Sequence, residues 1–207
     1  MSNSWLDEFK RTGAVWLHDG TAQRPHALLT SGLHSDGFVN CTYVTQRPAL
    51  VSRLLRDAQG LAPKLPKTKI DWVIGSAFGA ITFAHAVAER LEARAGFTEK
   101  DGDAMALKRF ELAPGETILV VEDVISTGGS TLKTLEGIRQ AGGGKVTVLP
   151  QILCLVNRSG RADLEGYAIT PLLELKINTW DAAACPLCKL GSQAVRPKTH
   201  WKELVGS

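Results

Sequence analysis

The sequence predicts an α/β fold, in which a parallel sheet is flanked by helices. Short apolar runs alternate with segments whose apolar residues recur at helical spacing. The β-branched run at 117–121 is typical of a strand buried on both faces of a parallel sheet. A helical segment at about 130–141 follows it, and the next apolar run lies at 146–156. Strands separated by helices of this length imply right-handed βαβ units.

The remaining elements are predicted from the same patterns. Two further core strands are expected at 70–74 and 105–112, with a helix at 78–95 that Gly96 closes. The part before the core carries a helical pattern near its start, a strand at 27–31, a short amphipathic helix at 48–60 and a connector at 61–69.

Composition excludes several classes of protein. A chain of 207 residues with 44% hydrophobic residues fits one globular domain with an ordinary core. The net charge of +3, spread along the chain, does not indicate binding to nucleic acid. No apolar run reaches the ~20 residues that span a bilayer, and the start lacks a signal-peptide pattern. We therefore expect a soluble cytoplasmic protein.

The segment 120–131 carries the chemistry. An apolar strand runs into Glu122 and Asp123, and then into a loop of small residues that opens a helix. Gly128 and Gly129 allow the backbone to approach a ligand closely, and N–H groups at a helix start suit a phosphate. The loop also offers four hydroxyl groups, from Ser126, Thr127, Ser130 and Thr131. Two acids repel a phosphate but suit vicinal hydroxyls, so the ligand that fits both halves is a sugar phosphate.

This segment resembles the binding motif for 5-phosphoribosyl-1-diphosphate (PRPP) of the type I phosphoribosyltransferases. The resemblance implies that Glu122 and Asp123 hold the ribose 2′- and 3′-hydroxyls while residues 126–131 cradle the 5′-phosphate. It also implies the fold of that family, with a hood and base-binding region at 1–60, a PRPP-binding core at 61–180 and a C-terminal tail at 181–207.

Other segments are similar to the orotate phosphoribosyltransferase family, in its shorter archaeal and thermophilic form. They follow one another in the family's order, at 29–40, 75–81, 107–110, 154–160 and 185–191. The likeness implies transfer of the phosphoribosyl group from PRPP to orotate in pyrimidine synthesis. Arg158 would bind the orotate carboxylate, Ser126 a base carbonyl, and Phe38 would stack on the pyrimidine ring. Phe38 is equally well explained as a core residue, and Arg158 as a surface arginine after a strand.

The resemblance also assigns the diphosphate side of the site. A first loop would bind the leaving diphosphate, through Gly75, Ser76, Ala77, Phe78 and Gly79. Mg²⁺ would meet the charge of this group without a dedicated cage of protein ligands. A mobile lid is expected at 96–115, with Lys100, Lys108 and Arg109 as its cations. Lys108, Arg109 and Asp123 are the predicted catalytic residues, in a homodimer whose subunits share their active sites.

Several positions depart from the family pattern. No histidine lies between Arg94 and Thr117, and Thr30 replaces a lysine before the turn at 31–32. Three more departures are Ser76 for proline, Ala80 for glycine and Asn157 for an acid. Two alternatives therefore stay open, a phosphoribosyltransferase for a purine or another base and a regulator that senses PRPP without turnover.

The spacing Cys185-Pro186-Leu187-Cys188 supplies half of a four-ligand zinc site. No second cysteine pair lies nearby in the sequence, and His200 is a solitary further candidate. The sequence therefore favours free thiols in a C-terminal turn, and we expect no metal-ligating residues in the chain.

Overall fold

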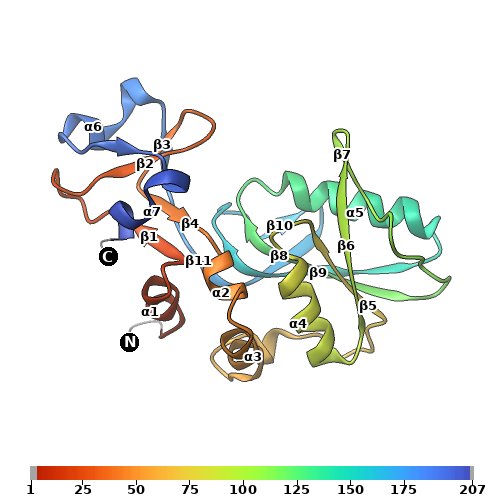
Figure 1. Cartoon of the computed structure of the whole chain (residues 1–207). Helices are drawn as coiled ribbons and strands as arrows, with labels where there is room; N and C mark the ends of the chain where they lie inside the picture. Colours follow the sequence, from red (N-terminus) through yellow and green to blue (C-terminus); the bar gives the residue numbers. More distant parts are fainter. Residues whose placement is uncertain (1–3, 206–207) are drawn as a thin grey trace. The chain divides into compact units, whose positions relative to one another are not determined.

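The computed structural model describes residues 4–205, and it divides the chain into two compact units. The first, called the core unit here, comprises residues 44–175. The second, called the hood unit, joins residues 1–43 to residues 176–207. Both units are drawn in Figure 1, and each is described by itself. No described helix combines the length and the apolarity that a membrane-spanning segment needs.

The core unit is built on a seven-stranded sheet in the order β10-β11-β9-β8-β5-β6-β7. Its strands are β5 (Trp72–Ser76), β6 (Arg94–Asp101), β7 (Ala104–Ala106), β8 (Thr117–Ile125), β9 (Thr147–Asn157), β10 (Asp163–Leu164) and β11 (Tyr167–Glu174). The strands from β11 to β6 pair in parallel, while β10 and β7 close the two edges as antiparallel partners. The α/β prediction is confirmed.

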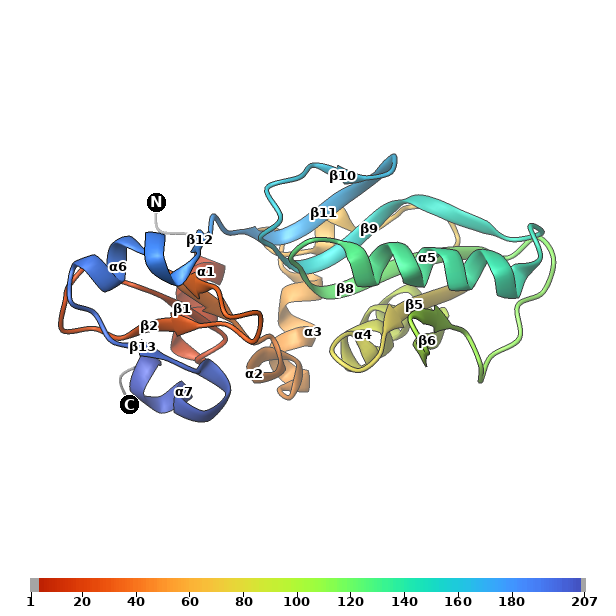
Figure 2. The same ribbon diagram turned by 90° about the horizontal axis from the view of Figure 1, so that it is seen from above.

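Two helices cover opposite faces of this sheet, as Figure 2 shows. Helix α4 (Ile81–Leu91) connects β5 to β6, and α5 (Gly129–Gly142) connects β8 to β9. The crossover from β5 runs to β6 on one side of the sheet order, and the crossover from β8 runs to β9 on the other side. Because crossovers of this kind are right-handed, their helices must lie on opposite faces of the sheet. The point where the direction reverses lies between β5 and β8. In open α/β sheets, ligands bind at the carboxyl ends of the strands at this point.

A continuous apolar layer lies beneath α5. Leu135 and Ile138 of the helix are fully buried against Ile118 and Val120 of β8. Other members come from neighbouring elements, including Trp72, Ile74, Ile152, Leu164 and Ile169. This packing fixes α5 on the sheet and so fixes the loop that precedes it. The rest of the core unit is helical, with α3 (Pro48–Arg56) and the single turn η1 (Ala62–Lys64) after α2 (Thr42–Thr45), which begins at the end of the hood unit.

The hood unit has short strands and short helices. A four-stranded sheet runs in the order β12-β3-β2-β13, and a separate pair joins β1 to β4. The strands are β1 (Val15–Leu17), β2 (His26–Leu28), β3 (His34–Ser35), β4 (Gly37–Val39), β12 (Thr179–Trp180) and β13 (Ala194–Val195). Its helices are α1 (Ser4–Arg11), η2 (Ala182–Ala184), α6 (Pro186–Lys189) and α7 (Pro197–Val205). Trp16, Ala27, Val195 and Leu204 form its apolar cluster.

The structure differs from the sequence prediction at several boundaries. The helix predicted from residue 78 begins at Ile81, because residues 77–80 form a loop after β5. The strand predicted at 105–112 is only Ala104–Ala106, since Gly102 turns the chain into a hairpin with β6. The segment predicted as a tail at 181–207 is part of the hood, because β13 pairs with β2. Segment 48–60 belongs to the core unit, as α3.

Helix α5 lies unusually close to the β6–β7 hairpin at Gly137. A Cβ atom at this position would lie 2.1 Å from the backbone oxygen of Met105. A glycine-to-alanine change inside a helix normally stabilises a protein by about 0.5–1 kcal/mol. We predict the opposite sign for Gly137→Ala, a loss of about 1–3 kcal/mol in the free energy of unfolding, because backbone must move. Denaturant titration measures this loss, and Lys133→Ala, at an exposed position of the same helix, is the control. Unchanged or raised stability of Gly137→Ala would contradict the close packing.

Candidate active site

The predicted PRPP segment occupies the carboxyl end of β8, the loop 126–128 and the start of α5. Gly128 has φ +83° and precedes the helix without a side-chain cap. A Cβ atom at Gly128 would lie 2.5 Å from Leu164 Cδ2, so a side chain is excluded there by contact as well as by conformation. The Gly129 N–H at the start of α5 makes only a long contact with Thr127 Oγ1, at 3.5 Å, and the hydroxyl-bearing residues Ser126, Thr127 and Ser130 are exposed.

Glu122 is a buried acid held by two hydroxyl groups. Its side chain is only 3% exposed. The Ser76 hydroxyl donates to it at 2.7 Å from Oε1, and the Thr131 hydroxyl donates at 3.2 Å from Oε2. Burial raises the pKa of Glu122 to about 8. The hydrogen bond from Ser76 lowers this pKa, and the nearby charge of Asp123 raises it. The acid thus ties β8 to the end of β5 and to the first turn of α5.

Asp123 faces the other side of the sheet. Successive side chains of a strand point to opposite faces, so the two acids diverge although they are adjacent in sequence. Asp123 lies against the loop after β5, since a Cβ atom at Gly79 would be 2.6 Å from its Oδ2. Burial also raises the pKa of the Asp123 carboxyl. The acid pair therefore joins the PRPP segment to the predicted diphosphate loop on one side and to α5 on the other.

The predicted diphosphate loop lies at the end of β5. The Ala77 N–H donates to the Thr98 carbonyl at 2.7 Å, so this amide is used within the core unit. Among the described residues, no backbone carbonyl accepts from the amide N–H groups of Phe78 and Gly79, and the Asp123 carboxylate lies beside Gly79. The Ala77–Phe78 peptide is cis, and the Phe78 side chain is 89% exposed. Of the predicted diphosphate loop, Ser76 directs its hydroxyl to Glu122.

Arg158 lies at the carboxyl end of β9, next to the end of β8. It follows β9 directly, and its backbone N–H donates to the Ile125 carbonyl at the end of β8, at 2.9 Å. Its side chain is partly buried, and burial lowers the pKa of the guanidinium. Within residues 4–205, no acid pairs with this group. Asn157 shapes the turn that carries it, because its amide donates to the Arg161 carbonyl and its Oδ1 accepts from Ser159.

Comparison with known proteins identifies the family. Residues 50–182 match the model of the phosphoribosyl transferase domain. The orotate phosphoribosyltransferase of Acidithiobacillus ferrooxidans is 40% identical over 185 residues, which cover 89% of this chain and 93% of the relative. That of Caldicellulosiruptor bescii is 38% identical over 202 residues, 97% of this chain and 98% of the relative. The chain belongs to the orotate phosphoribosyltransferase family.

A solved structure supports the same assignment. The orotate phosphoribosyltransferase of Aeropyrum pernix superposes with a TM-score of 0.63 at 25% identity, covering 82% of this chain and 93% of that chain. The resemblance found in the sequence is thus confirmed at the level of family and fold.

The predicted lid of this family member is the β6–β7 hairpin and the segment after it. Lys108 Nζ lies 3.0 Å from Asp101 Oδ1, and Arg109 Nε lies 3.0 Å from Glu99 Oε1. Both cations therefore pair with acids of the hairpin itself. Their side chains stay 43% and 63% exposed, and such surface pairs contribute only about 0–1 kcal/mol, so the acids hold these cations weakly. Lys100 is exposed on β6.

Phe38 lies in the hood unit, on β4. Its ring packs edge-on against Trp201 at a centroid distance of 5.4 Å, next to the cluster around Trp16. This contact supports the reading of Phe38 as a packing residue, while stacking on a pyrimidine stays a prediction.

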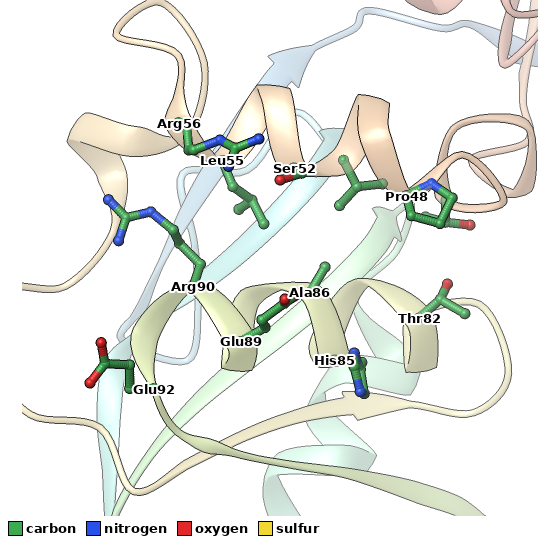
Figure 3. A pocket seen from close by; sticks show the side chains of 12 residues that line it. Pro48, Ser52, Leu55, Arg56, Thr82, His85, Ala86, Glu89, Arg90 and Glu92 are labelled. Carbon is green, nitrogen blue, oxygen red and sulfur yellow. The ribbon is translucent and has the colours of Figure 1, made fainter.

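A cavity of about 580 Å³ lies away from these residues, between α3 and α4 (Figure 3). Val51 and Leu55 line it from α3, and His85 and Arg90 from α4. None of the site residues predicted from the sequence lines it.

Sequence reasoning missed the internal role of three hydroxyl groups. Ser76 and Thr131 were expected to meet diphosphate and phosphate, yet both donate to Glu122. Thr98 bonds Thr134 of α5 at 2.8 Å, behind the same loop. Local spacing gives no signal for these contacts, because they join elements through the pairing of strands far apart in sequence.

Glu122 should make the stability of the protein depend on pH. An unfolded Glu has a pKa near 4.5, and burial raises the folded value to about 8, so unfolding between these values releases a proton. The contribution of Glu122 is therefore full below about pH 4.5 and is lost as pH rises toward 8. We predict that Glu122→Gln removes this fall in the free energy of unfolding, measured by denaturant titration across the range. Glu136→Gln, at an exposed position of α5, is the control and should retain the fall in the free energy of unfolding with rising pH. Parallel pH curves for Glu122→Gln and the unmodified chain would show that Glu122 does not cause this fall.

Proposed function

We propose that the chain transfers the 5-phosphoribosyl group from PRPP to orotate, giving orotidine 5′-phosphate and diphosphate. Orotate is a pyrimidine that carries a carboxylate. The observation that carries the proposal is Arg158, a partly buried cation at the carboxyl end of the sheet, beside the ribose-phosphate loop. Orotate phosphoribosyltransferases that resemble the chain over most of its length support the same acceptor.

The guanidinium of Arg158 suits a carboxylate for a physical reason. Burial without an anion disfavours the charged form, as the lowered pKa of the group reflects. A carboxylate would relieve this cost through two parallel N–H···O bonds, a geometry that arginine provides and lysine does not. Asn157 holds the turn at 157–161 and so limits where the guanidinium can lie. Ser126, exposed at the end of β8, would bond a base carbonyl in the same region.

PRPP would be held at the carboxyl ends of β5 and β8, the two strands between which the direction of the crossovers reverses. The first N–H groups of α5, with the hydroxyls of Ser126, Thr127 and Ser130, would bind the 5′-phosphate. Asp123 and Glu122 would accept hydrogen bonds from the ribose hydroxyls. Glu122 is buried and already accepts from two protein hydroxyls, so Asp123 would make the larger share of the contacts with the sugar.

The reaction would break the bond between the anomeric carbon and diphosphate as the orotate nitrogen attacks. Catalysis then depends on holding the reactants in line and on stabilising the charge of the leaving group. The N–H groups of Phe78 and Gly79 would meet that charge on one side, and Lys100, Lys108 and Arg109 of the hairpin on the other. Mg²⁺ fits this donor set, because the neighbouring carboxylate of Asp123 is a hard oxygen ligand and the substrate phosphates complete the coordination. The ion would neutralise the departing diphosphate.

Two further expectations belong to this proposal. We expect a homodimer in which the hairpin of one subunit reaches the active site of its partner, as the family resemblance implies. We also expect the reaction to take place in the cytoplasm, as the sequence predicts.

A substrate panel tests the proposed acceptor. The chain is mixed with PRPP, Mg²⁺ and one base at a time, and release of diphosphate is measured. We expect release with orotate and little with adenine, hypoxanthine or uracil. Release with a purine alone would move the activity to a purine enzyme. Saturable PRPP binding without release on any base would make the chain a PRPP-sensing regulator.

Replacing Arg158 separates the two substrates. Arg158→Ala should raise the KM for orotate roughly 10- to 100-fold, the value of losing a charge-assisted bond, with a much smaller effect on the KM for PRPP. Arg161→Ala is the matched control, because Arg161 is exposed on the same turn and its side chain should leave both values unchanged. Steady-state kinetics with each substrate varied in turn provides the measurement. Equal effects on the two substrates would remove Arg158 from the orotate site.

A further inference from the structure

Four potential metal ligands meet in the hood unit. His26 begins β2 and His34 begins β3, so the two lie on one antiparallel hairpin. Cys185 precedes α6 and Cys188 lies within it, about 150 residues further along the chain. One ligand atom from each residue lies within 4.8 Å of all the others. The cysteine pair that supplied half of a site in the sequence thus acquires two histidines in the fold.

We propose that His26, His34, Cys185 and Cys188 bind one structural Zn²⁺ ion. Two thiolates and two imidazoles are a ligand set that zinc takes in tetrahedral structural sites. Because all four positions are filled by protein, the ion would have no open position for a substrate. The site would serve to hold α6 and the segment around it to the β2–β3 hairpin.

Three distances between sulfur and nitrogen atoms of the cluster lie close to those of a tetrahedron around one ion. Ideal Zn–N and Zn–S bonds place neighbouring N and S ligands ~3.6 Å apart and two nitrogens ~3.4 Å apart. Cys188 Sγ lies 3.2 Å from His34 Nδ1 and 3.5 Å from His26 Nε2, and Cys185 Sγ lies 3.7 Å from His26 Nε2. The two ring nitrogens are 2.8 Å apart, so binding requires them to separate by ~0.6 Å.

The surroundings prepare His26 to bind through the nitrogen that faces the thiols. The Ser192 hydroxyl uses its only proton on the Arg24 carbonyl, at 2.6 Å. It must therefore accept from His26 Nδ1, which lies 2.9 Å away and carries the proton. The lone pair of His26 then resides on Nε2, the atom within reach of both cysteines. Metal-binding histidines are oriented by such a bond from the other ring nitrogen.

Burial favours a bound ion and still leaves an entry path. His26 and Cys185 are fully buried and His34 is 7% exposed, whereas Cys188 reaches the surface. Local structure also explains the need for a link. The strands of the hood sheet have only two or three residues, and most of the stretch 181–191 is exposed, so backbone pairing and apolar burial hold this segment weakly. This proposal departs from the sequence prediction of free thiols, because the histidines are 8 residues apart from each other and far from the cysteines in the chain.

Metal analysis of the full chain tests the proposal without reference to catalysis. Protein produced in zinc-supplemented medium and passed through a desalting column should contain about one zinc per chain by mass spectrometry. Cys185→Ser and His34→Ala should lose the ion. His34→Cys should retain it, because three thiolates and one imidazole also form structural zinc sites. Cys41→Ser is the matched control, since Cys41 is a buried thiol of the same unit outside the cluster, and it should keep the zinc.

Cobalt substitution covers the case in which a variant does not fold. The unmodified chain, stripped by chelator and reloaded with Co²⁺, should show the visible bands of tetrahedral cobalt together with thiolate charge-transfer absorption. Chelator should also lower the melting temperature of the unmodified chain, and added zinc should restore it. Zinc below about 0.1 per chain with no thiolate–cobalt absorption would overturn the proposal, as would zinc that persists unchanged in Cys185→Ser. Arg158→Ala should keep its zinc, so failure of the proposed reaction and failure of this site remain distinguishable.

Discussion

The hydrogen bonds that hold Glu122 connect the main parts of the core unit. A carboxyl that is 3% exposed costs free energy unless its oxygens are satisfied, and here hydroxyls from β5 and α5 satisfy it. The same acid occupies the central strand, one residue before Asp123. The positions of the two loops after β5 and after β8 are therefore coupled through a single buried side chain. Burial disfavours the charged form of this acid, and its pKa is therefore raised.

This arrangement would let one pair of acids serve two sides of the proposed substrate. The alternation of a strand sends Glu122 toward α5 and Asp123 toward the loop that contains Gly79. In the proposed reaction, the sugar would lie between a phosphate held by α5 and a diphosphate near Gly79, with the acids between them. Arg158 adds a cation at the end of the neighbouring strand, where an acceptor base with a carboxylate would be recognised. The glycines of both loops permit these approaches, because a side chain at Gly79 or Gly128 would collide with Asp123 or Leu164.

The hood unit depends on a different kind of interaction. Its strands are too short to be held by pairing alone, and its chain comes from two distant segments. Hydrophobic packing around Trp16 and Val195 joins these segments on one side. The histidine and cysteine cluster joins them on another, and the proposed ion would make that link much stronger than hydrogen bonds between neutral groups. Catalytic and structural chemistry would then be separated between the two units of the chain.

The sequence by itself determined the α/β class, the order of the core strands and helices, and, through the segment 120–131, the family. It could do so because apolar periodicity, glycine and adjacent acids are local signals that the chain carries over a few residues. The sequence did not predict the two-residue strands of the hood or the boundaries of α4 and β7. Pairing with distant partners decides where such elements end. Only the tertiary structure showed that Ser76 and Thr131 hold Glu122, that the two acids diverge, and that His26 and His34 meet the cysteine pair. Those contacts depend on the register between strands, which local spacing does not encode.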